Sequence, residues 1–103
     1  MKHLKILMLI KRLWVKYKIR ISKEYKRNYK NLTPDKKELV DAIVFRLSEN
    51  EVLEKKYNDH KLKGNFKGCR ECHIKPDLLL VYKKQDDILM LTCINVGSHS
   101  EIF

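Results

Sequence analysis

The sequence has little of what marks an exported, membrane-spanning or low-complexity chain. It contains only three glycines and two prolines in 103 residues, and no internal repeat or biased segment occurs. In the apolar N-terminal stretch 1–18, the longest uncharged run is 6–10. That run is too short for the core of a signal peptide or for a membrane span. We therefore expect a cytoplasmic protein that has no membrane partner.

Acidic residues are almost absent from the first thirty positions. Residues 1–30 hold eleven Lys and Arg and a single acidic residue, Glu24, whereas residues 31–103 hold twelve basic and twelve acidic residues. The whole net charge of +10 therefore lies in residues 1–30. A concentrated basic surface attracts polyanions through counterion release, so the partner would be nucleic acid or an acidic protein. A merely solvated charged face is an equally open interpretation of the composition. The cations predicted to bind RNA here are Lys18, Arg20, Lys23, Lys26, Arg27 and Lys30.

The sequence also lacks a complete set of metal ligands. Cys69, Cys72 and His73 spell the signature of c-type haem attachment, but that modification requires export, for which there is no signal. A structural zinc site usually draws on two ligand pairs, and only one such pair is present. We expect no metal and no cofactor, and we interpret the three cysteines as reduced, small core or strand residues.

The length predicts one domain with one modest core. Residues 1–16 are expected to form a basic extension with a short amphipathic helix, and 17–103 the compact domain. Apolar periodicity predicts a strand from Tyr17, a helix over 22–32, a second helix from Thr33 to about Leu47, and strands over 69–74, 78–83 and 88–94. This order predicts an α+β fold with two N-terminal helices packed on a four-stranded, mainly antiparallel sheet.

The segment 59–78, DHKLKGNFKGCRECHIKPDL, is the part of the chain best equipped for chemistry. Gly64 and Gly68 suit a turn with positive φ between two extended arms. The tail 97–103, GSHSEIF, adds a third histidine and a terminal aromatic residue. The candidate site residues, all expected at strand edges where side chains converge, are His60, His73, Asp77, His99 and Phe103.

These segments resemble the C-terminal half of YafQ-type toxins in the RelE/ParE toxin-antitoxin superfamily, whose members run DH-x-L-x-G, then R-(D/E)-x-H-(I/V/L)-x-P-D, then G-(S/T)-H-x-x-(L/I)-F. The resemblance covers 57–103. It implies a RelE-like fold and a ribosome-dependent mRNA endonuclease neutralised by a small cognate antitoxin. By position, the same five residues match the functional residues of that family. The implied partners are therefore an antitoxin protein, the ribosome and mRNA, without a small-molecule cofactor.

Metal-free RNA cleavage needs groups that the candidate site contains. A general base removes the proton of the 2′-OH, which attacks the adjacent phosphate, while a general acid protonates the leaving 5′-oxygen. Histidine suits both tasks near neutral pH, and Asp77 would orient a neighbouring imidazole or merely cap a turn. Phe103 offers a face on which a base stacks, or else closes the core. The cations predicted to bind phosphate here are Lys61, Lys63, Lys67, Arg70 and Lys75.

One position departs from the family pattern. Asn95 stands where many relatives have an arginine, which removes a permanent cation and weakens the expected stabilisation of the transition state. The alternative function is accordingly a member of the superfamily that only binds, such as a ParE-like gyrase inhibitor or a basic RNA-binding module. Three histidines at strand edges favour the enzyme, because a protein that only binds has no need of them.

Overall fold

The computed structural model describes residues 16–103. The predicted N-terminal extension, 1–16, and its amphipathic helix lie outside the described residues apart from Lys16, whose ammonium is 3.1 Å from the carboxylate of Glu49. Among 16–103, every helix is too short or too polar to cross a bilayer.

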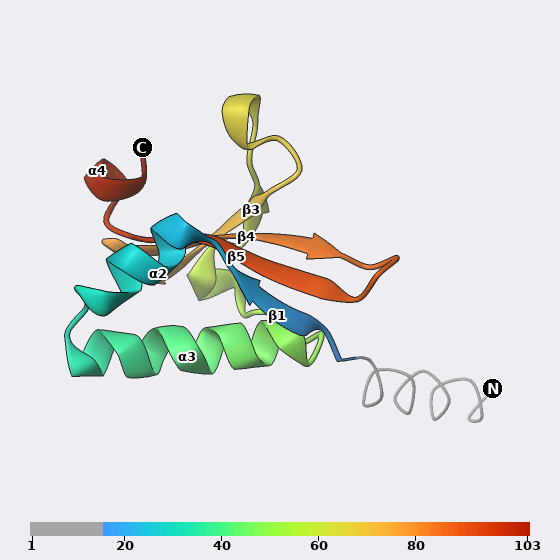
Figure 1. The fold of residues 1–103 in the computed structure, drawn as a ribbon, viewed down its shortest axis with the longest axis horizontal. Coiled ribbons are helices and arrows are strands. Elements are labelled where there is room, and N and C mark those ends of the chain that lie inside the picture. The colour runs from blue at the N-terminus through green and yellow to red at the C-terminus, as the bar shows by residue number, and fades with distance from the viewer. Residues whose placement is uncertain (1–15) are drawn as a thin grey trace.

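The domain is built on a five-stranded mixed sheet (Figure 1). The strand order is β1 (Lys18–Ile21), β5 (Met90–Gly97), β4 (Leu78–Gln85), β3 (Arg70–Lys75) and β2 (His60–Lys61). β1 runs parallel to β5, and the other neighbours are antiparallel. The predicted four-stranded sheet was wrong by one strand, because the two residues of β2 are too few to show a period-two pattern.

The two predicted helices form, and each begins after a capping residue. α2 (Lys23–Lys30) begins after Ser22, whose hydroxyl oxygen accepts a hydrogen bond from the Tyr25 N–H at 3.0 Å. α3 (Pro34–Ser48) begins after Thr33, which accepts from the Lys36 N–H at 3.4 Å, with Pro34 in the first turn. Each cap satisfies one of the N–H groups that a helix start leaves unpaired. A further helix, α4 (His99–Ile102), was not predicted and has Ser98 and Glu101 in a capping box.

The sheet has two faces with different roles. On the helix face, Cys72, Leu80 and Val96 are completely buried and belong to the core cluster that α3 completes with Val40 and Ile43. The opposite face, which we call the histidine face, carries His60 on β2 and Glu71 and His73 on β3, because paired residues point to one side and neighbours alternate. Figure 1 shows α3 along one side of the sheet, with α4 and the β2–β3 loop on the other.

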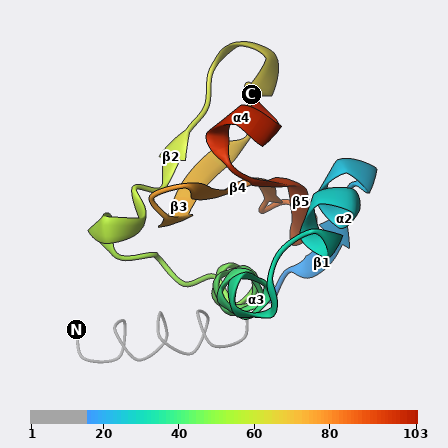
Figure 2. The ribbon, with the colours of Figure 1, turned by 90° about the vertical axis from the view of Figure 1, so that its left-hand side faces the viewer.

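The β2–β3 hairpin rises from the sheet as a projecting arm that bends toward α4 (Figure 2). Gly64 and Gly68 have φ of 65° and 91°, so the predicted turn with positive φ is confirmed. The arm is anchored at its base by Asp59, which accepts hydrogen bonds from the Tyr82 hydroxyl at 2.8 and 2.7 Å and from Arg70 Nε at 3.1 Å. Asp59 therefore has a structural role.

Candidate active site

Strand pairing brings two of the predicted histidines together. His60 on β2 lies directly opposite Glu71 on β3. Glu71 precedes His73 by two residues on that strand, so all three side chains share the histidine face. The ring centroids of His60 and His73 are 6.2 Å apart at 44°. Both rings are partly exposed, so a substrate can reach them.

The hydrogen bonds of the two rings fix which nitrogens remain free. His60 Nδ1 lies 2.6 Å from the carbonyl oxygen of Asn58, which can only accept, so Nδ1 carries the hydrogen. His73 Nε2 lies 2.9 Å from Glu71 Oε1, and an ionised carboxylate likewise only accepts. Each ring therefore has one nitrogen anchored, leaving His60 Nε2 and His73 Nδ1 for proton transfer.

Glu71 is the functional candidate that the sequence analysis missed. It is only 3% exposed, and its carboxylate is directed at His73. A carboxylate that accepts a hydrogen bond from an imidazole fixes the orientation of the ring. The signal was present in the sequence, since residues two apart on a strand point to the same face.

The remaining predicted residues, His99, Phe103 and Asp77, gather around α4. His99 is the first residue of that helix, and its backbone N–H donates to Asp77 Oδ1 at 3.4 Å. Asp77 therefore contacts the backbone of His99, and its two predicted roles, orienting an imidazole or capping a turn, stay predictions. Phe103 is 53% exposed, and its ring centroid lies 5.2 Å from that of His99.

Phe66, at the loop of the projecting arm, joins the two parts of the site. Its ring meets that of Phe103 edge-on at 5.2 Å between centroids. Within the sheet, Leu79 pairs with both His73 and Gly97, so the segment leading into α4 begins two strand spacings, or about 10 Å, from His73. The contact between Phe66 and Phe103 thus connects the projecting arm to the C-terminal helix.

Asn95 also lies on the histidine face. It pairs with Val81, which pairs with Glu71, placing Asn95 in the same cross-strand row as His60. Its side-chain oxygen accepts hydrogen bonds from Asn28 Nδ2 at 2.7 Å and from the Val96 N–H at 2.9 Å. Position 95 is thus occupied by an uncharged side chain, whose hydrogen bond with Asn28 connects β5 to α2.

The predicted RNA-binding cations fall on three separate surfaces. Lys61 and Arg70 pair with each other and point to the opposite side of the arm from His60 and Glu71. Lys75 is exposed at the end of β3, beside the turn to β4. The cations of β1 and α2 belong to the opposite edge of the sheet from β2. The structure therefore does not gather these cations around the histidines.

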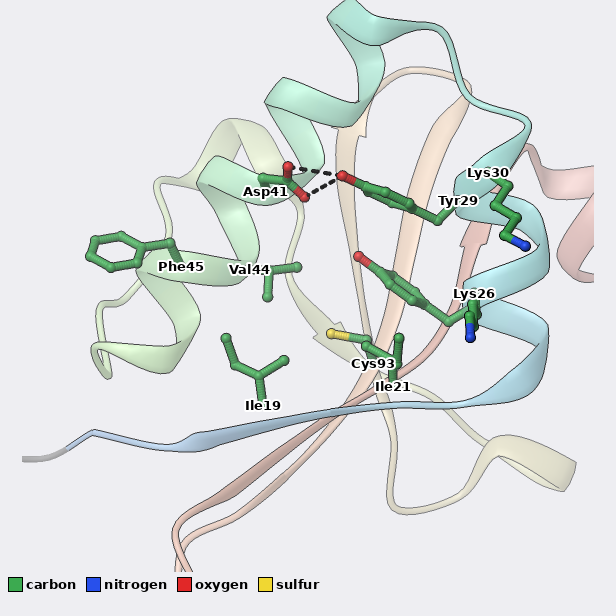
Figure 3. Close-up of a pocket in the computed structure, with 10 residues that line it drawn as sticks. Ile19, Ile21, Lys26, Tyr29, Lys30, Asp41, Val44, Phe45 and Cys93 are labelled. Atoms are coloured by element: carbon green, nitrogen blue, oxygen red, sulfur yellow. Dashed lines mark hydrogen bonds between the residues drawn. The ribbon is translucent and has the colours of Figure 1, made fainter.

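An apolar groove lies at that opposite edge, between β1, α2 and α3, with a volume of ≈ 550 Å³ (Figure 3). Ile19 and Ile21 of β1 are 50% and 48% exposed, and Phe45 of α3 is 60% exposed. Lys26 and Lys30 project from α2 at its rim, and the Tyr29 hydroxyl donates to Asp41 at 2.9 Å. Such a groove suits a protein segment with apolar side chains.

The cysteines occupy the predicted strands, or lie beside them. Cys72 and Cys93 are completely buried, and burial raises the pKa of each thiol to about 12. Cys69 is half-buried, and all three are free thiols. In the part of the chain from 16 to 103, no group of three or more His, Cys, Asp or Glu side chains is arranged to hold a metal ion.

Both curated proteins and solved structures resemble this chain. The mRNA interferase toxin YafQ of Escherichia coli (strain K12) is 40% identical over 47 residues, which are 46% of this chain and 49% of that protein. The chain thus matches about half the length of this curated relative. A metal-bound toxin from Helicobacter pylori is 38% identical, with TM-score 0.74 over 84% of this chain and 99% of that one.

The E. coli DinJ-YafQ toxin-antitoxin complex contains a chain that is 26% identical, with TM-score 0.69 over 86% of this chain and 99% of its own. The family model described as the bacterial toxin of a type II toxin-antitoxin system, YafQ, matches residues 17–103. This match covers nearly all of the described domain, including the projecting arm and α4. The chain therefore belongs to the YafQ family of bacterial toxins of type II toxin-antitoxin systems.

Proposed function

We propose that this protein is an endoribonuclease that cleaves mRNA on the ribosome by histidine acid-base catalysis, without a metal ion. The observation that carries the proposal is the pair His60 and His73, 6.2 Å apart, each with one ring nitrogen anchored and one free. The E. coli relative is named an mRNA interferase, which supports the same reaction class. The catalytic unit is residues 17–103, and it acts in the cytoplasm, where ribosomes are found.

In the proposed reaction, His60 Nε2 accepts the proton of the 2′-OH. The 2′-oxygen then attacks the adjacent phosphorus, the bond from phosphorus to the 5′-oxygen breaks, and a 2′,3′-cyclic phosphate forms. His99 donates a proton to the leaving 5′-oxygen. His73 balances the charge that develops on the phosphate, and its hydrogen bond to Glu71 supports this role by fixing the ring.

Phe103 supplies a surface for one base beside the scissile bond. Its ring is half exposed and braced by Phe66 and His99, so a face remains for stacking. Asp77 fixes the backbone of His99 and so positions the acid. Both residues thus assist chemistry carried out by the histidines.

The proposed protein partner is a small, acidic antitoxin. The E. coli YafQ chain was solved in complex with the antitoxin DinJ, which supports a partner of this kind. The apolar groove beside β1 offers exposed isoleucines, and Lys26 and Lys30 at its rim suit an acidic partner. Antitoxin binding there would also cover part of the basic surface of α2.

The binding-only alternative is favoured by one observation, the uncharged Asn95. Its oxygen is already engaged by Asn28 and by the Val96 N–H, so the row that holds His60 contains no fixed cation at this point. A ParE-like gyrase inhibitor or a basic RNA-binding module has no requirement for such a cation.

Product analysis separates these functions. Purified protein added to translating ribosomes should cut the mRNA and leave 2′,3′-cyclic or 3′-phosphate ends together with 5′-hydroxyl ends. Elemental analysis should find no stoichiometric metal. Intact mRNA, with gyrase inhibited instead, would establish the alternative, and one tightly bound zinc or copper per chain would overturn the metal-free mechanism.

A further inference from the structure

A second groove lies behind the projecting arm, with a volume of ≈ 860 Å³. It is bounded by the arm, by the chain just after α3 and by the β4–β5 hairpin. Five cationic side chains line it: Lys61, Lys63, Lys67, Arg70 and Lys84. Sequence reasoning placed the first four beside the histidines, but the structure gathers them here with Lys84.

The acidic residues of this groove already have partners. Glu51 lies 3.2 Å from Arg46 Nε, and Asp59 binds Arg70 and Tyr82. Asp86 accepts a hydrogen bond from the Tyr17 hydroxyl. Even so, the five cationic side chains that line the groove outnumber its three acidic ones, Glu51, Asp59 and Asp86.

Two kinds of cation line the groove. Arg70 and Lys84 are engaged, Arg70 by Asp59 and Lys84 by the Asn50 side chain and the Tyr17 ring. Lys61, Lys63 and Lys67 are exposed and form no ion pair within residues 16–103. Three flexible ammonium groups on one arm remain available for an anionic ligand.

The groove faces away from the proposed site of cleavage. Lys61 follows His60 directly on β2, and consecutive strand residues point to opposite sides. Leu62 continues the pairing through its N–H, which donates to the Cys69 carbonyl at 2.9 Å, so Lys63 shares the side of Lys61. An RNA strand held by these lysines is therefore separated by the arm from the strand at the histidines.

We propose that this groove binds the sugar-phosphate backbone of ribosomal RNA and so fixes the arm on the ribosome. The inference rests on the proposed function. Long, exposed lysines on a projecting loop suit phosphates. A protein segment is better matched by the groove beside β1, where Ile19, Ile21 and Phe45 are between 48% and 60% exposed. Ribosomal RNA is favoured over the cleaved mRNA because the histidines lie on the other side of the arm.

The test compares two double variants with equal change in charge. Lys63→Glu with Lys67→Glu alters the groove, and Lys55→Glu with Lys83→Glu alters exposed lysines that do not line it. Affinity for ribosomes free of mRNA is measured across a range of salt concentrations. The groove variant should bind about tenfold more weakly than the control variant, and its salt slope should fall by about 1.5, since each lost phosphate contact removes roughly 0.7 to 0.9.

Three other outcomes would overturn the proposed role of the groove. Equal losses in both variants would show a general charge effect, and a loss seen only with mRNA present would assign the lysines to mRNA. Unchanged ribosome affinity with weakened antitoxin binding would make this a protein surface. If groove-dependent binding is found but wild-type protein cuts nothing, the proposed cleavage fails while the groove stands.

Discussion

Glu71 and His73, two residues apart on β3, are joined by a hydrogen bond of 2.9 Å between Glu71 Oε1 and His73 Nε2. The carboxylate is nearly inaccessible, whereas the imidazole is partly exposed. The buried carboxylate of Glu71 therefore fixes the orientation of the His73 ring through Nε2 and leaves Nδ1 free of this contact. In the proposed mechanism Glu71 is a positioning residue, since it acts on RNA only through His73.

Replacing Glu71 with glutamine should show whether the carboxylate acts in catalysis, by orienting His73, or only in folding. The amide retains a hydrogen-bonding group of the same size but no charge, and a buried amide is cheaper to desolvate than a carboxylate. We expect the single-turnover cleavage rate to fall about tenfold or more, with a changed pH profile and an unfolding free energy that is equal or higher. A wild-type rate and pH profile would show that Glu71 has no part in the chemistry.

The bond between Tyr82 and Asp59 should contribute measurably to stability. Tyr82→Phe removes the hydroxyl that donates to both carboxylate oxygens and leaves Asp59 with Arg70 alone. Since Tyr82 is 1% exposed, we expect a loss of about 1–3 kcal/mol in urea unfolding. The matched control is Tyr29→Phe, whose hydroxyl also bonds a carboxylate, Asp41, but in a more exposed setting. Equal losses in the two variants would contradict a special role for the buried bond.

The thiols should differ sharply in reactivity. Alkylation requires the thiolate, and burial raises the pKa of Cys72 and Cys93 to about 12, so both remain protonated at neutral and mildly alkaline pH. Native protein treated with iodoacetamide at pH 8 should gain one label, at the half-buried Cys69, and three labels after denaturation. Rapid native labelling of Cys72 or Cys93 would contradict the packing of the helix face.

The helices and their boundaries were largely predictable because their signals are local. Ser22 and Thr33 cap the helix starts, and the apolar residues spaced along one face of α3 are buried: Val40, Ile43, Val44 and Leu47. The last strand was less well placed. It begins at Met90 and not at Ile88, because Leu89 has φ of 49° and ends the turn.

The convergence of the candidate site was only partly predictable. Strand alternation places His60 and His73 on one face once the register is known, but register is a property of the folded sheet. No pattern in the sequence shows that the arm bends so that Phe66 meets Phe103. The register also explains why Lys61 and Lys63 of the arm point away from the histidines.

The basic edge of β1 and α2 should also contribute to ribosome binding. The predicted contacts are Lys18, Arg20, Lys23, Lys26, Arg27 and Lys30. Reversing Lys23 and Arg27, which do not line the apolar groove, should weaken ribosome affinity and flatten its salt dependence relative to the Lys55→Glu, Lys83→Glu control. The free energy of unfolding in urea serves as the folding control, and an unchanged salt slope would show that this edge does not contact RNA.

The central claim is that histidine chemistry cuts the mRNA, and His99→Gln tests it most directly. Glutamine keeps a hydrogen-bonding side chain of similar reach without a titratable nitrogen, and the Ser98 and Glu101 cap of α4 is retained. Loss of a general acid or base typically costs about 10² to 10⁴ in rate. The measurement is single-turnover cleavage of ribosome-bound mRNA across pH, with ribosome affinity determined in parallel. We expect the variant to bind ribosomes like wild type, to cut at least about a hundredfold more slowly, and to lose one inflection from the pH profile; cleavage at the wild-type rate would contradict the catalytic role of His99.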